Sequence, residues 1–226
     1  MVSDAPTLWI YILIFNFLKM KTNKIFLGIY AFVILALSSC TKESDTELIQ
    51  HNDILFREDF SSNTDNSELN TPGWTNFNEI GTRKWSEQSF QGNGYAEFSG
   101  FGSGQLVNVG WLISPKIDMD LHEGEKISFT TAQNFLRSLE NALELLVSTN
   151  YDGSNVLAAD WTLIPAKTAT FETERFERVS SGVIDLSTFK GKLNFAFRYK
   201  GSGTNSNLTG TYQVDNITVY YPSNVK

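Results

Sequence analysis

Short runs in which apolar and polar residues alternate are the feature that most constrains the fold of this 226-residue chain. In the run from Phe195 to Tyr199, for example, the three aromatic residues would share one face of an extended strand. A period of two is typical of strands with one buried face, because a helix repeats its apolar face every three or four residues. Turn-forming sequences such as Gln91-Gly92-Asn93-Gly94 separate the runs. The pattern therefore predicts a β-rich domain.

Eleven such runs can be identified, and they leave no room for a repeated strand-helix-strand unit. One stretch is ambiguous, because Phe135, Leu139 and Leu143 recur at helical spacing. Its second half also alternates and its neighbours are strands, so we expect a strand there. The fold class predicted is all-β, a two-sheet antiparallel β-sandwich of jelly-roll type. The predicted strands span residues 54–60, 74–77, 84–90, 95–99, 109–113, 126–133, 143–148, 162–165, 177–184, 193–199 and 212–220.

The N-terminal 39 residues have the organisation of a signal peptide. Lys21 and Lys24 form a short basic stretch, an apolar run follows over residues 25–37, and the sequence Leu37-Ser38-Ser39-Cys40 ends it. The apolar run is too short to span a bilayer comfortably. We therefore expect residues 1–39 to be a lipoprotein signal peptide. Met20 begins a complete signal sequence by itself, so translation from Met20 is the alternative to translation from Met1.

Cys40 is the only cysteine of the chain, so no intrachain disulfide can form, and lipidation explains its position. Acyl chains contribute about 0.8 kcal/mol per buried methylene, which would hold the protein on a membrane. The alternative is a chance cysteine after a plain signal peptide or a membrane-spanning segment. Residues 40–52 are polar and predict a flexible tether, and residues 53–222 predict a single domain.

Lys42, Glu43 and Asp45 follow the cysteine directly. These charges resemble the export signal of Bacteroidota-type surface lipoproteins, which favours the cell surface over the periplasmic face of the outer membrane. An ordinary solvated linker is the alternative.

The acidic balance of the chain excludes some partners. The net charge is −7, and loss of residues 1–39, which carry three lysines and one aspartate, would lower it to −9. Nucleic acid and anionic lipid headgroups would meet like charge, whereas neutral glycans and divalent cations would not.

Five segments together carry a family likeness. In order along the chain they resemble the landmarks of choice-of-anchor J domains, relatives of the cleaved-adhesin and MAM-like jelly rolls of bacterial surface proteins. The likeness covers residues 54–221 and implies a jelly-roll sandwich used for attachment or ligand binding, often with structural calcium and without a shared enzymatic activity. The segments are residues 54–60, Gly73-Trp74, 111–118, 145–149 with 160–162, and 214–217.

Catalysis has little support in the sequence. The only histidines are His51, in the tether, and His122, in a polar turn, and no Gly-x-Ser-x-Gly sequence is present. A lipidated Cys40 is not available as a nucleophile. A carbohydrate-active enzyme stays open as an alternative, because it needs only two carboxylates. Glu97, between Tyr95 and Phe98, is the nearest candidate, and solvent-face alternation explains it more simply.

Calcium is the metal that the chain could bind, because carboxylates and amides supply the oxygen ligands that calcium prefers. Glu58, Asp59 and Asp215 match acidic landmarks of the resembling family, and first and last strands lie close in many jelly rolls. Asn93 could add an amide oxygen. We therefore predict a structural calcium ion at Glu58, Asp59, Asn93 and Asp215. The alternative is that Glu58 faces solvent and Asp59 caps a turn.

Sugar binding needs an aromatic surface with polar groups beside it. Trp74, Trp85, Tyr95 and Phe101 lie in the loop-rich first half and are the predicted ligand-binding residues, with burial in the core as the alternative for both tryptophans. The expected function is non-catalytic binding of an extracellular glycan or protein. The alternatives are an accessory subunit of an outer-membrane assembly and a carbohydrate-active enzyme.

Overall fold

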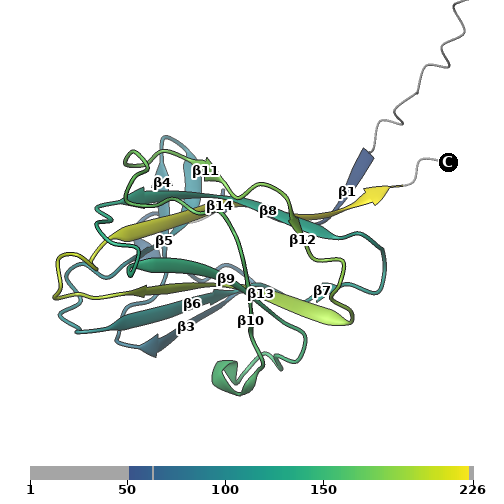
Figure 1. Cartoon of the computed structure of the whole chain (residues 1–226), viewed down its shortest axis with the longest axis horizontal. Helices are drawn as coiled ribbons and strands as arrows, with labels where there is room; N and C mark the ends of the chain where they lie inside the picture. The colour runs from purple at the N-terminus through teal and green to yellow at the C-terminus, as the bar shows by residue number, and fades with distance from the viewer. Residues whose placement is uncertain (1–50, 63, 224–226) are drawn as a thin grey trace, which may run out of the picture. The chain divides into compact units, whose positions relative to one another are not determined.

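The computed structural model describes residues 51–62 and 64–223. The predicted signal peptide, Cys40 and most of the predicted tether lie outside these residues. The described residues form two antiparallel β-sheets packed face to face, with one short 3-10 turn at Val156–Ala158 (Figure 1). In the described part of the chain, no helix is long and apolar enough to cross a membrane.

The eight-stranded sheet has the order β11-β8-β14-β5-β4-β2, with β1 beside β14 and β12 beside β8. Its long strand β14 pairs with β8 on one edge, and on the other edge first with β5 and then with β1. The strands are β1 His51–Glu58, β2 Ser67–Glu68, β4 Ser86–Phe90, β5 Asn93–Ser99, β8 Lys126–Asn134, β11 Val179–Ser180, β12 Ile184–Asp185 and β14 Thr211–Ser223.

The six-stranded sheet has the order β10-β9-β13-β6-β3, with β7 beside β13. Every strand pair in both sheets is antiparallel. The strands are β3 Thr75–Ile80, β6 Asn108–Ile113, β7 Ile117–Asp118, β9 Ala142–Ser148, β10 Thr162–Ile164 and β13 Lys192–Gly201.

The core between the sheets is rich in aromatic side chains. Phe98 stacks on Tyr199 with 4.3 Å between ring centroids, and Trp85 meets Phe98 edge-on at 5.6 Å. Gly110 permits this packing, because a Cβ atom at that position would lie 2.1 Å from Cε2 of Phe98. The alternating residues of β5 and β13 thus place one aromatic face of each strand in the core.

The outer faces of the two sheets are covered differently. On the six-stranded sheet, Tyr151, Val156 and Trp161 from the β9–β10 connection pack over Trp111 and form a second small core. This connection is the loop drawn below the label β10 in Figure 1. Among the described residues, no comparable apolar cluster covers the outer face of the eight-stranded sheet.

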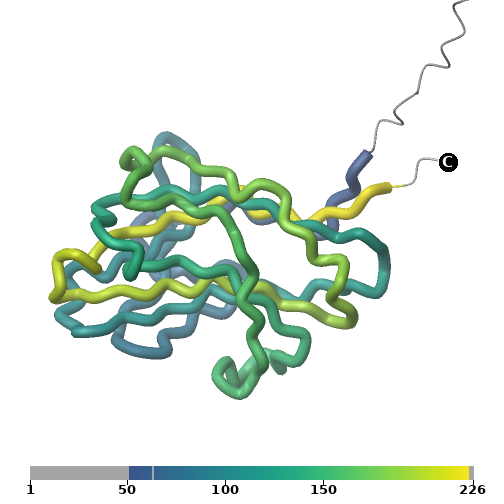
Figure 2. The backbone as a smooth tube through the Cα atoms, viewed as in Figure 1, coloured from purple at the N-terminus to yellow at the C-terminus, as the bar shows by residue number. Residues whose placement is uncertain are grey.

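A crossing segment, residues 165–178, runs from the six-stranded to the eight-stranded sheet (Figure 2). Its middle is tied to β8, because the Ala169 amide donates to Thr131 Oγ1 at 2.8 Å and Gln133 Nε2 donates to the Thr173 carbonyl at 2.6 Å. These contacts fix where the segment arrives beside β8 and β14.

The predicted all-β, two-sheet antiparallel sandwich is confirmed, with three local differences. The predicted strand over residues 177–184 is two strands, β11 and β12, interrupted at Gly182, whose φ is +71°. Strands β2 and β7 were not predicted, because two residues cannot show a periodicity. The ambiguous stretch forms a strand only in its second half, after a turn that begins at Phe135 with φ +60°.

Candidate functional site

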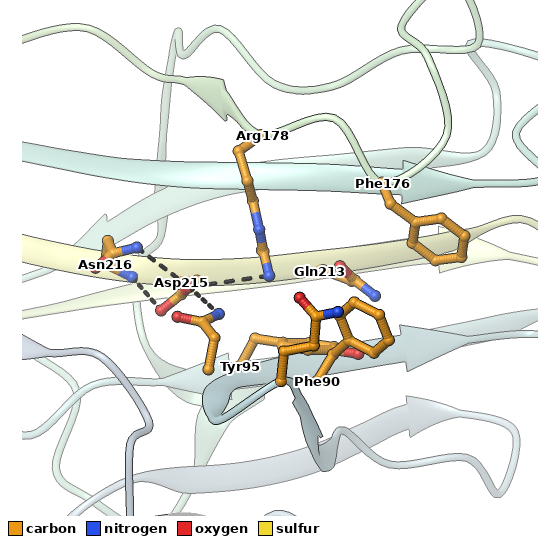
Figure 3. Close-up of a pocket in the computed structure, with 9 residues that line it drawn as sticks. Phe90, Tyr95, Phe176, Arg178, Gln213, Asp215 and Asn216 are labelled. Carbon is orange, nitrogen blue, oxygen red and sulfur yellow. Dashed lines mark hydrogen bonds and ion pairs between the residues drawn. The ribbon is translucent and has the colours of Figure 1, made fainter.

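A pocket of about 650 Å³ opens on the outer face of the eight-stranded sheet (Figure 3). Since Ala96 and Val214 point into the core, the period of two turns Tyr95, Gln213 and Asp215 outward. The β4–β5 hairpin and the end of the crossing segment supply the two walls. The lining residues are Phe90, Gln91, Asn93, Tyr95, Phe176, Arg178, Gln213, Asp215 and Asn216.

Asp215 lies at the bottom of the pocket, at a β-bulge in β14. The register with β8 shifts between Asp215 and Thr218, and Asn216 adopts φ +52°. The Asp215 side chain is 1% exposed, and its carboxylate accepts hydrogen bonds from Asn93 Nδ2 at 3.0 Å and from Asn216 N and Nδ2 at 2.6 and 3.1 Å. A buried charge needs such partners. Asp215 therefore holds the bulge and the hairpin together.

Arg178 crosses the pocket just before β11. One of its guanidinium nitrogens lies 3.9 Å from the Asp215 carboxylate, and its Cζ atom lies 5.0 Å from the centre of the Tyr95 ring. Arg178 donates no hydrogen bond to any described residue, and its side chain is 32% exposed. A guanidinium carries five N–H donors in a fixed plane. The ring and the carboxylate thus orient donors that are free to meet a ligand.

Two exposed phenylalanines stand at the rim. Phe90 is 67% exposed and precedes a two-residue turn in which Gln91 and Gly92 have φ +52° and +82°. Phe176 is 55% exposed at φ +64°, held by a 2.8 Å hydrogen bond from its amide to the Gln133 carbonyl. For a bulky residue this conformation costs about 1 kcal/mol or more, and such strain clusters at ligand sites.

A polar pair continues the floor away from Asp215. Gln213 Nε2 donates to Glu97 Oε2 at 2.9 Å. Burial raises the pKa of the Glu97 carboxyl, and burial followed by the Glu97 charge raises the pKa of the Tyr95 phenol. The sequence analysis explained Glu97 by solvent-face alternation, and its side chain lies on the outward face, half-buried against Gln213. The buried carboxylate of Asp215 is engaged by amide donors.

The four predicted ligand-binding residues do not lie together. Tyr95 lines the pocket, and Phe101 is 73% exposed farther along the same sheet face. Trp85 is fully buried, so its prediction as a ligand residue is wrong and the core alternative holds. Trp74 is half-buried against Phe56, and its Nε1 donates to Glu58 at 3.3 Å. The sequence analysis missed Phe90, Phe176, Arg178 and Gln213.

The predicted calcium ligands, Glu58, Asp59, Asn93 and Asp215, do not turn their oxygens toward one common point. Asn93 and Asp215 are adjacent as expected, but the Asn93 amide nitrogen faces the carboxylate. Glu58 accepts from the Phe60 amide and from a tryptophan, and hydrogen bonds from Ser61 lower the pKa of Asp59. Within the described residues, no group of three or more His, Cys, Asp and Glu side chains could hold a metal. The arrangement does not fit an oxygen shell, and calcium binding stays an untested prediction.

The chain was compared with known proteins. A family model described as Domain of unknown function (DUF5017) matches residues 82–223. No curated protein matches the chain significantly in sequence. Among solved structures, the K2 cleaved adhesin domain of Lys-gingipain has a TM-score of 0.50 at 16% identity, covering 73% of this chain and 96% of that one.

Two further solved structures have lower TM-scores. The K1 cleaved adhesin domain of Lys-gingipain from Porphyromonas gingivalis W83 has a TM-score of 0.48 at 18% identity, covering 76% and 99% of the two chains. A xylan-binding domain from Paenibacillus barcinonensis has a TM-score of 0.42 at 16% identity, covering 77% and 99%. The predicted likeness to cleaved adhesins is confirmed at the level of the jelly-roll fold by the K2 domain. The choice-of-anchor J assignment and the lipid anchor stay predictions.

Proposed function

The chain belongs to the DUF5017 family, and we propose that this member is a non-catalytic module that binds a glycan in the pocket crossed by Arg178. One observation carries the proposal. Exposed aromatic rings stand beside hydrogen-bonding groups that are oriented but not used within the protein. A sugar ring offers the complementary surfaces, an apolar face and a polar edge.

The rings and the donors have separate roles. Phe90 and Phe176 can pack against the apolar face of a sugar, as aromatic rings do in other concave sites. Arg178 and Gln91 offer hydrogen-bond donors at the same opening. The volume of about 650 Å³ lies inside the range of small-ligand pockets, roughly 300–1,000 Å³. A protein partner would instead need about 800 Å² of matching surface on each side.

The location of this activity belongs to the same proposal. The single cysteine after an apolar run supports lipidation at Cys40 and placement on the outer membrane, facing the cell surface or the periplasm. The part of the predicted tether that precedes β1, residues 40–50, would at no more than ~3.5 Å per residue keep the module within some tens of ångströms of the membrane. Radiolabelled palmitate should enter the wild-type protein and not the Cys40→Ser variant. Equal labelling of both would refute the anchor.

Binding can be tested with a glycan array followed by calorimetric titration of the best polysaccharide. The Arg178→Ala variant should bind at least about tenfold more weakly, since charged hydrogen bonds contribute about 1.5–3 kcal/mol. Arg57→Ala is the matched control, because Arg57 is an exposed arginine on β1 with one ion pair at 4.0 Å. Unchanged affinity of the Arg178 variant, or binding to proteins without binding to any glycan, would overturn the proposal.

A further inference from the structure

We infer that the ligand is an extended, linear polysaccharide lying along β5 and β14, with a second pocket at the far end of the sheet holding its other part. This inference rests on the proposed function and narrows it. A site for a single terminal sugar needs only the pocket crossed by Arg178. A site for a chain needs a continuous floor and a second place to hold sugar rings.

The second pocket also places exposed aromatic rings beside polar side chains. It has a volume of about 530 Å³. Phe101 and Phe135, 73% and 50% exposed, stand in its lining, and the Arg175 guanidinium covers the Phe135 ring at 4.3 Å. The lining residues are Ser99, Phe101, Asn134, Phe135, Arg137, Ser206, Thr209 and Thr211.

One residue that lines this pocket carries a buried polar atom without a partner. The side-chain carbonyl oxygen of Asn134 is buried and accepts no hydrogen bond from any described residue. A buried acceptor left without a donor costs about 1–3 kcal/mol, so proteins rarely keep one without a reason. The oxygen has no exposed surface, so a sugar hydroxyl would meet it only after the Asn134 side chain rotates toward the pocket.

The floor between the pockets is continuous. Thr211 pairs with Ser99 and Gln213 with Glu97, and all four outward side chains are polar. Thr211 donates to Ser99 at 2.8 Å, and Gln213 donates to Glu97 at 2.9 Å. A third hollow, of about 550 Å³, contains Glu97, Ser99 and Phe101, so it borders the second pocket through shared residues.

The separation of the pockets sets the size of the ligand. Tyr95 lines one and Ser99 the other, four residues apart on β5. At about 3.4 Å per residue, the two ends lie ~14 Å apart. One sugar ring in either pocket would leave the other pocket empty. A chain would fill both pockets, and the ligand would lose its translational freedom only once.

The test is a calorimetric titration of the full-length protein with linear oligosaccharides of increasing length, from the disaccharide upward. They are cut from the linear polysaccharide that binds best on the glycan array. Affinity should rise with length and then level off. Phe101→Ala should weaken the longest oligosaccharide about tenfold and leave the disaccharide unaffected. Leu163→Ala, an exposed position on β10 of the opposite sheet, is the control and should change neither.

The failures of the two proposals are distinguishable. If the disaccharide binds as tightly as the longest chain and Phe101→Ala has no effect, the extended site is wrong while the pocket at Arg178 stands. If Arg178→Ala leaves affinity unchanged, or if no glycan of the array binds, both are wrong. Because Phe101 is largely exposed, its variant should keep the wild-type melting temperature, and a large fall would refute its role as a surface residue.

Discussion

Replacing Asp215 with alanine should lower the free energy of unfolding strongly, because the Asp215 carboxylate holds the bulge of β14 and the β4–β5 hairpin together. The substitution removes the acceptor of three hydrogen bonds, one from Asn93 and two from Asn216. Each bond to a charged group contributes about 1.5–3 kcal/mol, but the two from Asn216 are not independent. The ion pair with Arg178 adds under ~1 kcal/mol, because its atoms are 3.9 Å apart and the arginine is partly exposed.

The free energy of unfolding should therefore fall by about 3–5 kcal/mol, the usual cost of breaking a buried charged arrangement. Urea denaturation measures it directly: with a slope of about 2 kcal/mol per molar, the midpoint should drop by about 2 M. Asp215→Asn is the matched control, because its carbonyl still accepts from the Asn216 amide and flipped side-chain amides can restore the other bonds. That variant should lose about 1–2 kcal/mol. A loss below ~1 kcal/mol for Asp215→Ala would refute the view that this carboxylate holds the bulge.

Three further predictions concern the same sheet. Burial raises the pKa of Glu97 in the folded state, so the protonated side chain gives its full stabilisation below about pH 4, and this stabilisation is lost as the pH rises through the folded pKa. Glu97→Gln should therefore raise the free energy of unfolding at neutral pH and not at pH 3. A lower free energy of unfolding at neutral pH, measured by urea denaturation, would contradict this. Gly110→Ala should lower stability by about 1–3 kcal/mol in the same assay, since its Cβ would meet the Phe98 ring at 2.1 Å; an unchanged midpoint would show that the core is looser than its packing indicates. Removal of divalent cations with EDTA should leave the melting temperature unchanged, because amide donors face Asp215; a fall restored by calcium would support the predicted ion instead.

The sequence carries more information about the core than about the surface. Alternation identifies which side of β5, β13 and β14 is apolar, since burial of one strand face is a local property of the sequence. Alternation cannot distinguish a large aromatic residue in the core from one at the rim of a pocket. Trp85 and Phe101 are both large apolar residues near turns, and only the packing of Trp85 under Phe98 separates their roles.

The sequence by itself determined the all-β class and most strand positions, because these follow from a two-residue period and from turn residues. The tertiary structure decided the site. Arg178 and Phe176 are brought over β14 by a segment that crosses between the sheets, more than 80 residues after Tyr95 in the sequence. No local pattern specifies such a meeting, because it depends on which strands pair and on where one bulge turns the chain.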